Sequence, residues 1–279
     1  MRALLDGDIY AFRPASSAEG DNLSIAIARM EEMIDNTLAA VGADEFSIFL
    51  SGENNFRYSV YPEYKANRTQ PKPRFLRDCK QYLIDKYKAE VSDGCEADDL
   101  LGIAQCKAIE ENDGCAFGIY NVPLTVICSL DKDLRMIPGN HYSFEISGTS
   151  SLGKKWVKPA EHVNVSEDQA IRNFYYQVLV GDSTDNIKGV KGIGPKKANF
   201  ILDDAEIDWE VDGKRMPLEY YYLAAVEGEF STQEELVMTG QCLWIFRKPN
   251  DVWRIPNFET TKREGQGPEA ATVGEGHDS

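Results

Sequence analysis

Apolar and polar residues follow one another in blocks along the chain, and the blocks predict strands and helices in alternation. Residues 2–8 (RALLDGD) form a short apolar run that ends in acids, which is typical of a buried strand. Apolar residues then recur at helical spacing over 22–42, where Gly42 is a helix stop. Two further short apolar runs, 45–52 and 124–133, predict strands that also end in polar residues.

Three more helices are expected from the same pattern. One carries apolar residues at helical spacing from Phe75 to Tyr87, and the next is ADDLLGIAQCKAI, from residue 97. Ser166 and Gln169 have the spacing of a capping box at the start of a third helix. Strands that alternate with helices indicate an α/β fold with a mostly parallel central sheet. In such sheets, ligands collect at the carboxyl ends of the strands.

The bulk properties narrow the class of protein. A chain of 279 residues can build one large domain or two smaller ones. No apolar run approaches the roughly 20 residues that span a membrane, and acids interrupt the first residues too early for a secretory signal. The cysteines have neither zinc-site nor disulfide spacing, so we expect reduced thiols in a cytoplasmic protein. They are Cys79, Cys95, Cys106, Cys115, Cys128 and Cys242.

Carboxylates stand where the predicted strands end and where one helix begins. These acids are Asp6, Asp8, Glu96, Asp98, Asp99, Asp131 and Asp133. A single acid at a strand end or helix start needs no ligand, but seven at one sheet edge repel one another unless cations neutralise them. Hard oxygen ligands without a nearby His or Cys cluster favour Mg²⁺ or Mn²⁺. Their number indicates two ions, an arrangement used for displacement at phosphate.

The formal charge of −16 argues against a polyanionic partner, yet net charge does not describe local sites. Basic residues cluster over 61–88, interleaved with aromatic ones, as suits a single nucleic-acid strand. Phe75 and Tyr82 fit the core face of a helix, whereas Tyr61 and Tyr64 do not. A solvated helix is the simpler interpretation of this cluster. Its basic residues are Lys65, Arg68, Lys72, Arg74, Arg77 and Lys80.

A second basic cluster follows two acids in VLVGDSTDNIKGVKGIGPKKA, residues 178–198. Asp182 and Asp185 occupy the turn after the capped helix. Glycines then permit a tight turn whose N–H groups can face a phosphate, and lysines add positive charge. Such a turn grips a nucleic-acid backbone without reading its sequence. The residues concerned are Lys188, Gly189, Lys191, Gly192, Gly194, Lys196 and Lys197.

These motifs, in this order, resemble the 5′-nuclease superfamily of flap endonucleases and 5′→3′ exonucleases, most closely its small bacteriophage members. The matching segments are LLDGD, YPEYKANR, EADD, SLDKD and GDSTDNIKGVKGIGPKKA, between residues 4 and 198. The resemblance implies a PIN-like α/β catalytic domain over 1–160, with a helical arch near 61–88. It also implies a helical DNA-binding region over 161–257, with a helix-hairpin-helix at 181–200. Residues 258–279 lack apolar periodicity and are expected to be a disordered tail.

The resemblance also implies roles for individual residues. Lys65 and Arg68 resemble the basic pair at the scissile phosphate, and the helix-hairpin-helix resembles one that often binds K⁺. The metal-centre acids are Asp6, Glu96, Asp98, Asp99, Asp131, Asp133, Asp182 and Asp185. The other implied DNA contacts are Tyr64, Lys72, Arg74, Lys188, Gly189, Lys191, Gly192, Gly194, Lys196 and Lys197.

The implied activity is metal-dependent hydrolysis at DNA 5′ ends and flaps, and of RNA primers in RNA–DNA hybrids, during replication or repair. We expect a monomer without a membrane partner, in the host cytoplasm if the source is a phage. The exonuclease or flap preference and the product length are not indicated.

One departure from the family pattern concerns the segment after the second strand. Members usually carry a metal-centre Asp a few residues before an aromatic–Arg pair, here Phe56-Arg57, but this chain has Ser51, Gly52 and Glu53. Either Glu53 or a water beside Gly52 can replace the missing carboxylate, or activity is lost. A non-catalytic DNA-structure-binding protein of the same fold therefore stays open. A PIN-type ribonuclease also stays open, although that type normally lacks the arch and the lysine-bearing hairpin.

Overall fold

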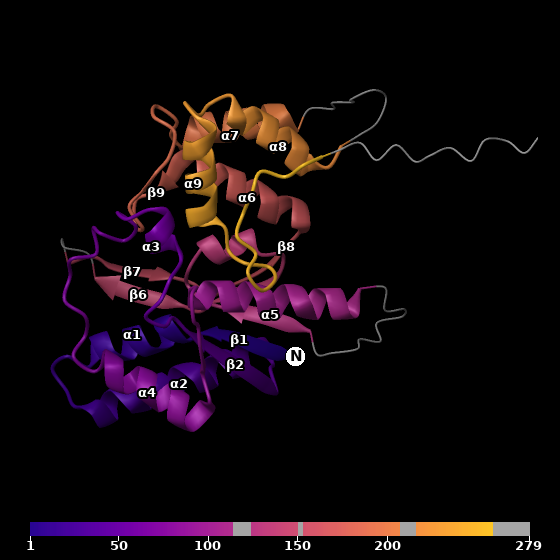
Figure 1. Ribbon diagram of the computed structural model, residues 1–279. Coiled ribbons are helices and arrows are strands. Elements are labelled where there is room, and N and C mark those ends of the chain that lie inside the picture. The colour runs from indigo at the N-terminus through magenta and orange to yellow at the C-terminus, as the bar shows by residue number, and fades with distance from the viewer. Residues whose placement is uncertain (114–123, 150–152, 207–215, 259–279) are drawn as a thin grey trace, which may run out of the picture.

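The computed structural model describes residues 1–113, 124–149, 153–206 and 216–258 (Figure 1). A six-stranded sheet, in the order β3-β2-β1-β4-β5-β8, lies at the centre of this described part. The first five strands pair in parallel, and β8 pairs antiparallel with β5 at one edge. The predicted mostly parallel α/β fold is therefore confirmed. The strands are β1 (Arg2–Asp6), β2 (Glu45–Leu50), β3 (Glu90–Val91), β4 (Thr125–Cys128), β5 (Gly139–Ser143) and β8 (Glu161–Val165).

The first strand is buried on both faces, as its continuous apolar run predicts. It ends at Asp6, and α1 (Gly7–Ser17) begins at the next residue. Gly7 is required at this junction, because a Cβ there would lie 2.6 Å from the Phe49 carbonyl oxygen. The prediction that Asp8 closes the strand is wrong, since Asp8 lies in the first turn of α1.

Helices cover both faces of the sheet (Figure 1). One face carries α1, α2 (Leu23–Val41) and α4 (Leu76–Tyr87), which share one apolar core with β1 and β2. The predicted helix over 22–42 is confirmed: the Asn22 side chain caps its start, and Gly42 ends it in the left-handed region. The other face carries α5 (Ala97–Asn112), which packs on β1, β2 and β4.

A second group of helices, formed by the later part of the chain, encloses an aromatic core of Phe174, Tyr175, Tyr222, Trp244 and Trp253. The predicted capping box at Ser166 and Gln169 is present. The strand β8 belongs to the central sheet, so these helices begin after it. They are α6 (Glu167–Val180), α7 (Pro195–Ala205), α8 (Leu218–Glu227) and α9 (Gln233–Leu243). The predicted division into two units at residue 160 stays a prediction.

Shorter elements lie between these strands and helices along the chain. They are α3 (Arg57–Val60), the 3₁₀ helix η2 (Asp133–Met136), β6 (Ile146–Thr149), β7 (Lys155–Lys158), β9 (Gly181–Asp182) and β10 (Ile187–Lys188). Residues 61–75 have no regular strand or long helix. The second half of the predicted arch is the helix α4, which buries Cys79 and Leu83 against the sheet-covering helices. The amphipathic helix expected from Phe75 to Tyr87 is therefore confirmed, and the helical arch near 61–88 stays a prediction.

Several sequence expectations concern features outside the sheet. In the described residues, the cysteines are buried free thiols, and Cys115 lies outside those residues. The predicted tail, from 259 onward, also lies outside them. No helix in the described ranges has the length and apolarity needed to cross a membrane.

Candidate active site

Carboxylates from three elements meet at the carboxyl edge of the sheet. The strands β1 and β4 are parallel neighbours, with Leu5 opposite Cys128, so their ends lie side by side. Ser129 links the acids that follow them: its hydroxyl donates to Asp6 Oδ2 at 2.7 Å and accepts the Asp131 N–H at 3.0 Å. Asp98, in the first turn of α5, completes this group, because Asp6 and Asp131 both act electrostatically on it.

The carboxylates of Asp6, Asp98 and Asp131 are close enough to repel one another, and burial and this repulsion both raise the pKa values of Asp6 and Asp98. Burial raises the pKa of Asp6 to about 7, and the neighbouring Asp8 and Asp131 carboxylates add to the increase. Burial also raises the pKa of Asp98 well above its ordinary value, and Asp6, Asp131 and Glu96 raise it further. A nearby cation would favour the charged forms, so the group has the chemistry of a cation site.

A second acidic group begins at Asp131 and includes residues of the β9–β10 turn. Burial raises the pKa of Asp133 to about 7, with contributions from Asp131 and Asp182. Desolvation raises the pKa of Asp131, and both Asp185 and Asp182 contribute. Asp131 therefore couples the strand-end acids to the turn after α6, as expected if one centre holds two ions.

The predicted basic pair lies within these acids. Lys65 forms an ion pair with Glu96, and its Nζ lies 3.5 Å from Asp185 Oδ2, while Arg68 pairs with Asp185. Burial lowers the pKa of Lys65, but Glu96 and Asp185 act more strongly and raise it. Lys65 has a left-handed backbone (φ 56°), which its N–H stabilises by donating to the Asp185 carbonyl at 2.9 Å. The loop containing Lys65 is thus tied to the β9–β10 turn.

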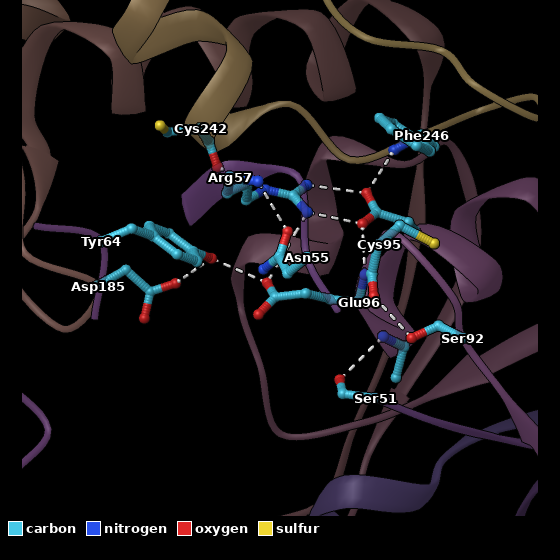
Figure 2. A network of polar contacts seen from close by, with 12 residues as sticks. Ser51, Asn55, Arg57, Tyr64, Ser92, Cys95, Glu96, Asp185, Cys242 and Phe246 are labelled. Atoms are coloured by element: carbon cyan, nitrogen blue, oxygen red, sulfur yellow. Dashed lines mark hydrogen bonds and ion pairs between the residues drawn. The ribbon is translucent and has the colours of Figure 1, made fainter. Parts of the chain in front are cut away.

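The position of Tyr64 argues against the prediction that its ring contacts DNA. Its side chain belongs to the apolar core, with 3% of its surface exposed. The hydroxyl lies 2.8 Å from Glu96 Oε2 and 2.9 Å from Asp185 Oδ2, between the two carboxylates (Figure 2). Tyr64 therefore positions acids instead of stacking on bases.

The contacts of Asp99 argue against the prediction that it is a metal ligand. It is fully buried and accepts a bidentate pair from Arg57, with distances of 2.7 and 2.8 Å. Its oxygens also accept the backbone N–H groups of Glu96 and Phe246, at 2.9 and 3.0 Å. Both oxygens are occupied by protein donors, so Asp99 caps α5 while its neighbours face the centre.

Arg57 is the residue that the sequence interpretation missed. Its guanidinium also donates to the carbonyl of Cys242 at 2.9 Å (Figure 2) and to that of Trp244 at 2.6 Å. It therefore joins the start of α5 to the C-terminal end of α9. The aromatic–Arg pair was visible in the sequence, but only as a landmark, because nothing nearby indicated a buried partner.

The departure at residues 51–53 has a structural counterpart. The Ser51 hydroxyl accepts the Ala97 N–H at 3.0 Å, and the Ser51 N–H donates to Asp8 Oδ2 at 3.2 Å. A Cβ at Gly52 would lie 2.1 Å from the Ser92 carbonyl oxygen, so only glycine fits at this position. Glu53 is exposed. The carboxylate beside position 51 is therefore that of Asp8, whose other oxygen lies 2.5 Å from Lys80 Nζ.

The remaining predicted DNA contacts lie on the surface. Lys72 and Arg74 are exposed in the 61–75 segment. Gly189 packs against the end of α6, and Gly192 has a left-handed backbone (φ 83°), so both glycines are needed for the turn. Gly194 is the N-cap of α7. The lysines Lys188, Lys191, Lys196 and Lys197 are exposed around this turn, and Lys197 lies 3.2 Å from Glu229.

Within the four described ranges, no three acidic, histidine or cysteine side chains already form a cage that could hold a metal ion. The donor set nevertheless fits hard cations. It consists of carboxylates that raise one another's pKa, with no thiolate or imidazole among them. The chemistry of the residues present is thus compatible with Mg²⁺ or Mn²⁺.

Comparison with known proteins agrees with this geometry. The family model for the 5′-3′ exonuclease N-terminal resolvase-like domain matches residues 2–161, more than half of the chain, so the chain belongs to that family. The 5′-3′ exonuclease of Buchnera aphidicola is 29% identical over 217 residues, which cover 71% of this chain and 68% of that protein. DNA polymerase I of Bacillus subtilis is 31% identical over 187 residues, covering 60% of this chain and 19% of the polymerase.

This chain therefore spans about a fifth of the DNA polymerase I relatives that it matches. Among solved structures, a bacteriophage T5 protein co-crystallized with metal ions has a TM-score of 0.51 at 19% identity, over 87% of this chain and 89% of that one. A T5 flap endonuclease complex with DNA and metal ions has a TM-score of 0.52 at 16% identity, over 87% and 97% of the two chains. These two likenesses show the fold alone.

Proposed function

We propose that this chain is a metal-dependent nuclease that hydrolyses phosphodiesters at DNA 5′ ends and flaps, and RNA primers in RNA–DNA hybrids, during replication or repair. One observation supports this above the others: Lys65 and Arg68 lie among the carboxylates at the edge of the sheet. Relatives named 5′-3′ exonuclease and flap endonuclease support the same class of activity. A monomeric state and a cytoplasmic location stay predictions.

The carboxylates are proposed to hold two Mg²⁺ or Mn²⁺ ions. Asp6, Glu96, Asp98 and Asp131 form the proposed strand-end group, and Asp133, Asp182 and Asp185 the proposed turn group. Asp8, which lies beside Ser51 and acts electrostatically on Asp6, is added as a ligand in place of the acid absent at position 51. When bound, such ions polarise the phosphodiester and offset charge on its oxygens.

Lys65 and Arg68 are proposed to act on the reacting phosphate. In hydrolysis, a water oxygen bonds to phosphorus while the bond to the leaving oxygen breaks, and that oxygen takes up a proton. Negative charge increases on the phosphate oxygens in the transition state, where two fixed cations stabilise it most. Ion pairs with Glu96 and Asp185 hold the side chains of Lys65 and Arg68 in place before the substrate binds.

The exposed lysines around Gly192 are proposed to hold the duplex backbone downstream of the reacting phosphate, with K⁺ bound by the turn. Backbone contacts of this kind position the substrate without reading its sequence. Lys72 and Arg74 are proposed to contact the strand that enters along residues 61–75.

The test of this function uses three labelled substrates: a 5′ flap, a recessed duplex and an RNA–DNA hybrid, each with Mg²⁺ or with EDTA. We expect Mg²⁺-dependent products from the 5′ end. Asp98→Asn, which removes a charge at constant shape, is expected to abolish cleavage and to leave DNA binding within a few-fold. Asp35→Asn is the matched control, because Asp35 is an exposed acid of α2.

Each alternative predicts a different result. A non-catalytic DNA-structure-binding protein binds the flap but cleaves no substrate in Mg²⁺ or Mn²⁺. A PIN-type ribonuclease cleaves RNA and leaves the DNA flap intact. Wild-type turnover by Asp98→Asn would contradict the assignment of the metal centre.

A further inference from the structure

A two-stranded hairpin, formed by β6 and β7, extends from the molecule outside the central sheet (Figure 1). Its strands pair with Gly148 opposite Trp156 and Ile146 opposite Lys158. Trp156 and Val157 are exposed to 45% and 60%, although both are large apolar residues. Two exposed apolar side chains on a short hairpin contribute little to the stability of the core, which indicates that the hairpin has a binding role instead.

The Trp156 ring has a defined position on this hairpin. A Cβ at Gly148 would lie 2.7 Å from the ring, so the indole lies directly over the glycine backbone. One part of the ring is therefore supported by the opposite strand, and the rest faces solvent. A supported and accessible aromatic surface is suited to stacking with a nucleic-acid base.

Positive charge surrounds this ring and continues toward the acidic centre. Lys158 lies on the same face of β7 as Trp156, two residues further along the strand, and acts electrostatically on Glu161 of β8. Glu161 also pairs with Arg135 and lies within the field of Lys132. Lys132 stands between Asp131 and Asp133 in the sequence, so the basic residues lead from the hairpin to the acidic site.

We propose that the β6–β7 hairpin binds a single strand of nucleic acid that is continuous with the strand at the acidic centre. Trp156 stacks on a base, and Lys158, on the same face of β7, and Lys132 contact successive phosphates. This inference rests on the proposed function, because the hairpin serves the substrate of that site. A nucleic acid is favoured over an acidic protein because a supported indole beside a row of lysines matches both bases and phosphates, in a chain whose formal charge is −16.

The test measures binding of a fluorescent (dT)₁₅ strand by anisotropy, in EDTA so that nothing is cleaved. Trp156→Ala is expected to weaken binding by about 10-fold, and Trp156→Phe by much less, since a ring remains. Val157→Ala is the matched control, because residue 157 lies on the opposite face of the hairpin and is expected to bind like the wild type. Lys158→Ala with Lys132→Ala is expected to lower the log–log salt slope by about 1.4, at roughly 0.7 for each lost phosphate contact.

Far-UV circular dichroism and thermal melting establish that each variant is folded. Wild-type affinity of folded Trp156→Ala, with an unchanged salt slope of the lysine variant, would overturn the proposal, and a protein partner would then explain the hairpin. If Trp156→Ala is not folded, Trp156→Phe and the lysine variant decide. Cleavage of a recessed duplex in Mg²⁺ is measured separately. A protein that cleaves but binds (dT)₁₅ without the hairpin contradicts this inference alone, whereas one that binds through Trp156 but never cleaves contradicts the proposed function.

Discussion

The buried ion pair between Arg57 and Asp99 provides the sharpest test of how the acidic centre is held. Arg57→Met keeps most of the side-chain volume and leaves the Asp99 carboxylate buried without its cation. The side chains are only 3% and 0% exposed, so water cannot replace the lost partner. Breaking a buried pair on one side costs about 3–5 kcal/mol. At about 2–4 °C per kcal/mol for a chain of this size, the melting temperature should fall by about 6–20 °C.

A surface pair of equal length is the control. Arg2 and Glu45 are also 2.7 Å apart, but their side chains are 44% and 55% exposed. Arg2→Met should therefore cost less than about 1 kcal/mol, because water solvates the remaining carboxylate. The two pairs have the same shortest distance and differ in burial, and Arg57→Met additionally removes the donors to the Cys242 and Trp244 carbonyls, which adds to its cost.

The assay is urea unfolding of the metal-free protein, followed by circular dichroism, with thermal melting as a second measure. The double variant Arg57→Met, Asp99→Leu should regain part of the loss, because it removes the isolated charge. It should not reach wild-type stability, since the N–H groups of Glu96 and Phe246 lose their acceptor. A loss for Arg57→Met no larger than that for Arg2→Met would refute this account of the pair.

Three further predictions concern the centre itself. Lys65→Ala should lower kcat by about 10²-fold with little change in KM, as expected for a lost electrostatic stabiliser, and a wild-type single-turnover rate at saturating enzyme would contradict this. Asp8→Asn should weaken Mn²⁺ binding, measured by calorimetry, by about 10-fold, and Ser51→Asp in the same protein should restore it; no recovery would place Asp8 outside the metal centre. Without metal, stability should fall between pH 6.5 and 8.5, because the raised pKa of Asp6, about 7, makes the folded state bind the proton more tightly than the unfolded chain. The contribution of Asp6 is complete below pH 3.8 and is lost as the pH rises through 7; about 1 kcal/mol of it is lost between pH 6.5 and 8.5. Mg²⁺ should reduce this loss of stability. A melting temperature in EDTA that is independent of pH would contradict the electrostatic argument.

The sequence by itself determined the elements and the edge where the chemistry lies. Apolar runs and helical spacing are local properties, so the helix over 23–41 and its stop at Gly42 could be predicted within one residue. The ends of parallel strands share one edge, so acids that follow β1 and β4 meet there whatever else the fold contains. The ion pair between Lys65 and Glu96 was not predicted, because the two residues lie in different elements and the family resemblance implied only that both belong to the site.

Tertiary structure decided which residues of each motif face the centre. In EADD, the two adjacent aspartates are chemically equivalent. Asp99 is buried only because Arg57 and the segment at 242–246 pack against it and form hydrogen bonds with it or with each other. Tyr64 read as a surface aromatic among basic residues, but the β9–β10 turn packs over it and buries its hydroxyl between two acids. Asp8 stands beside Ser51 because β1 and β2 are in parallel register, with Asp6 opposite Phe49. These outcomes depend on partners more than 30 residues away, and local periodicity carries no information about such distant contacts.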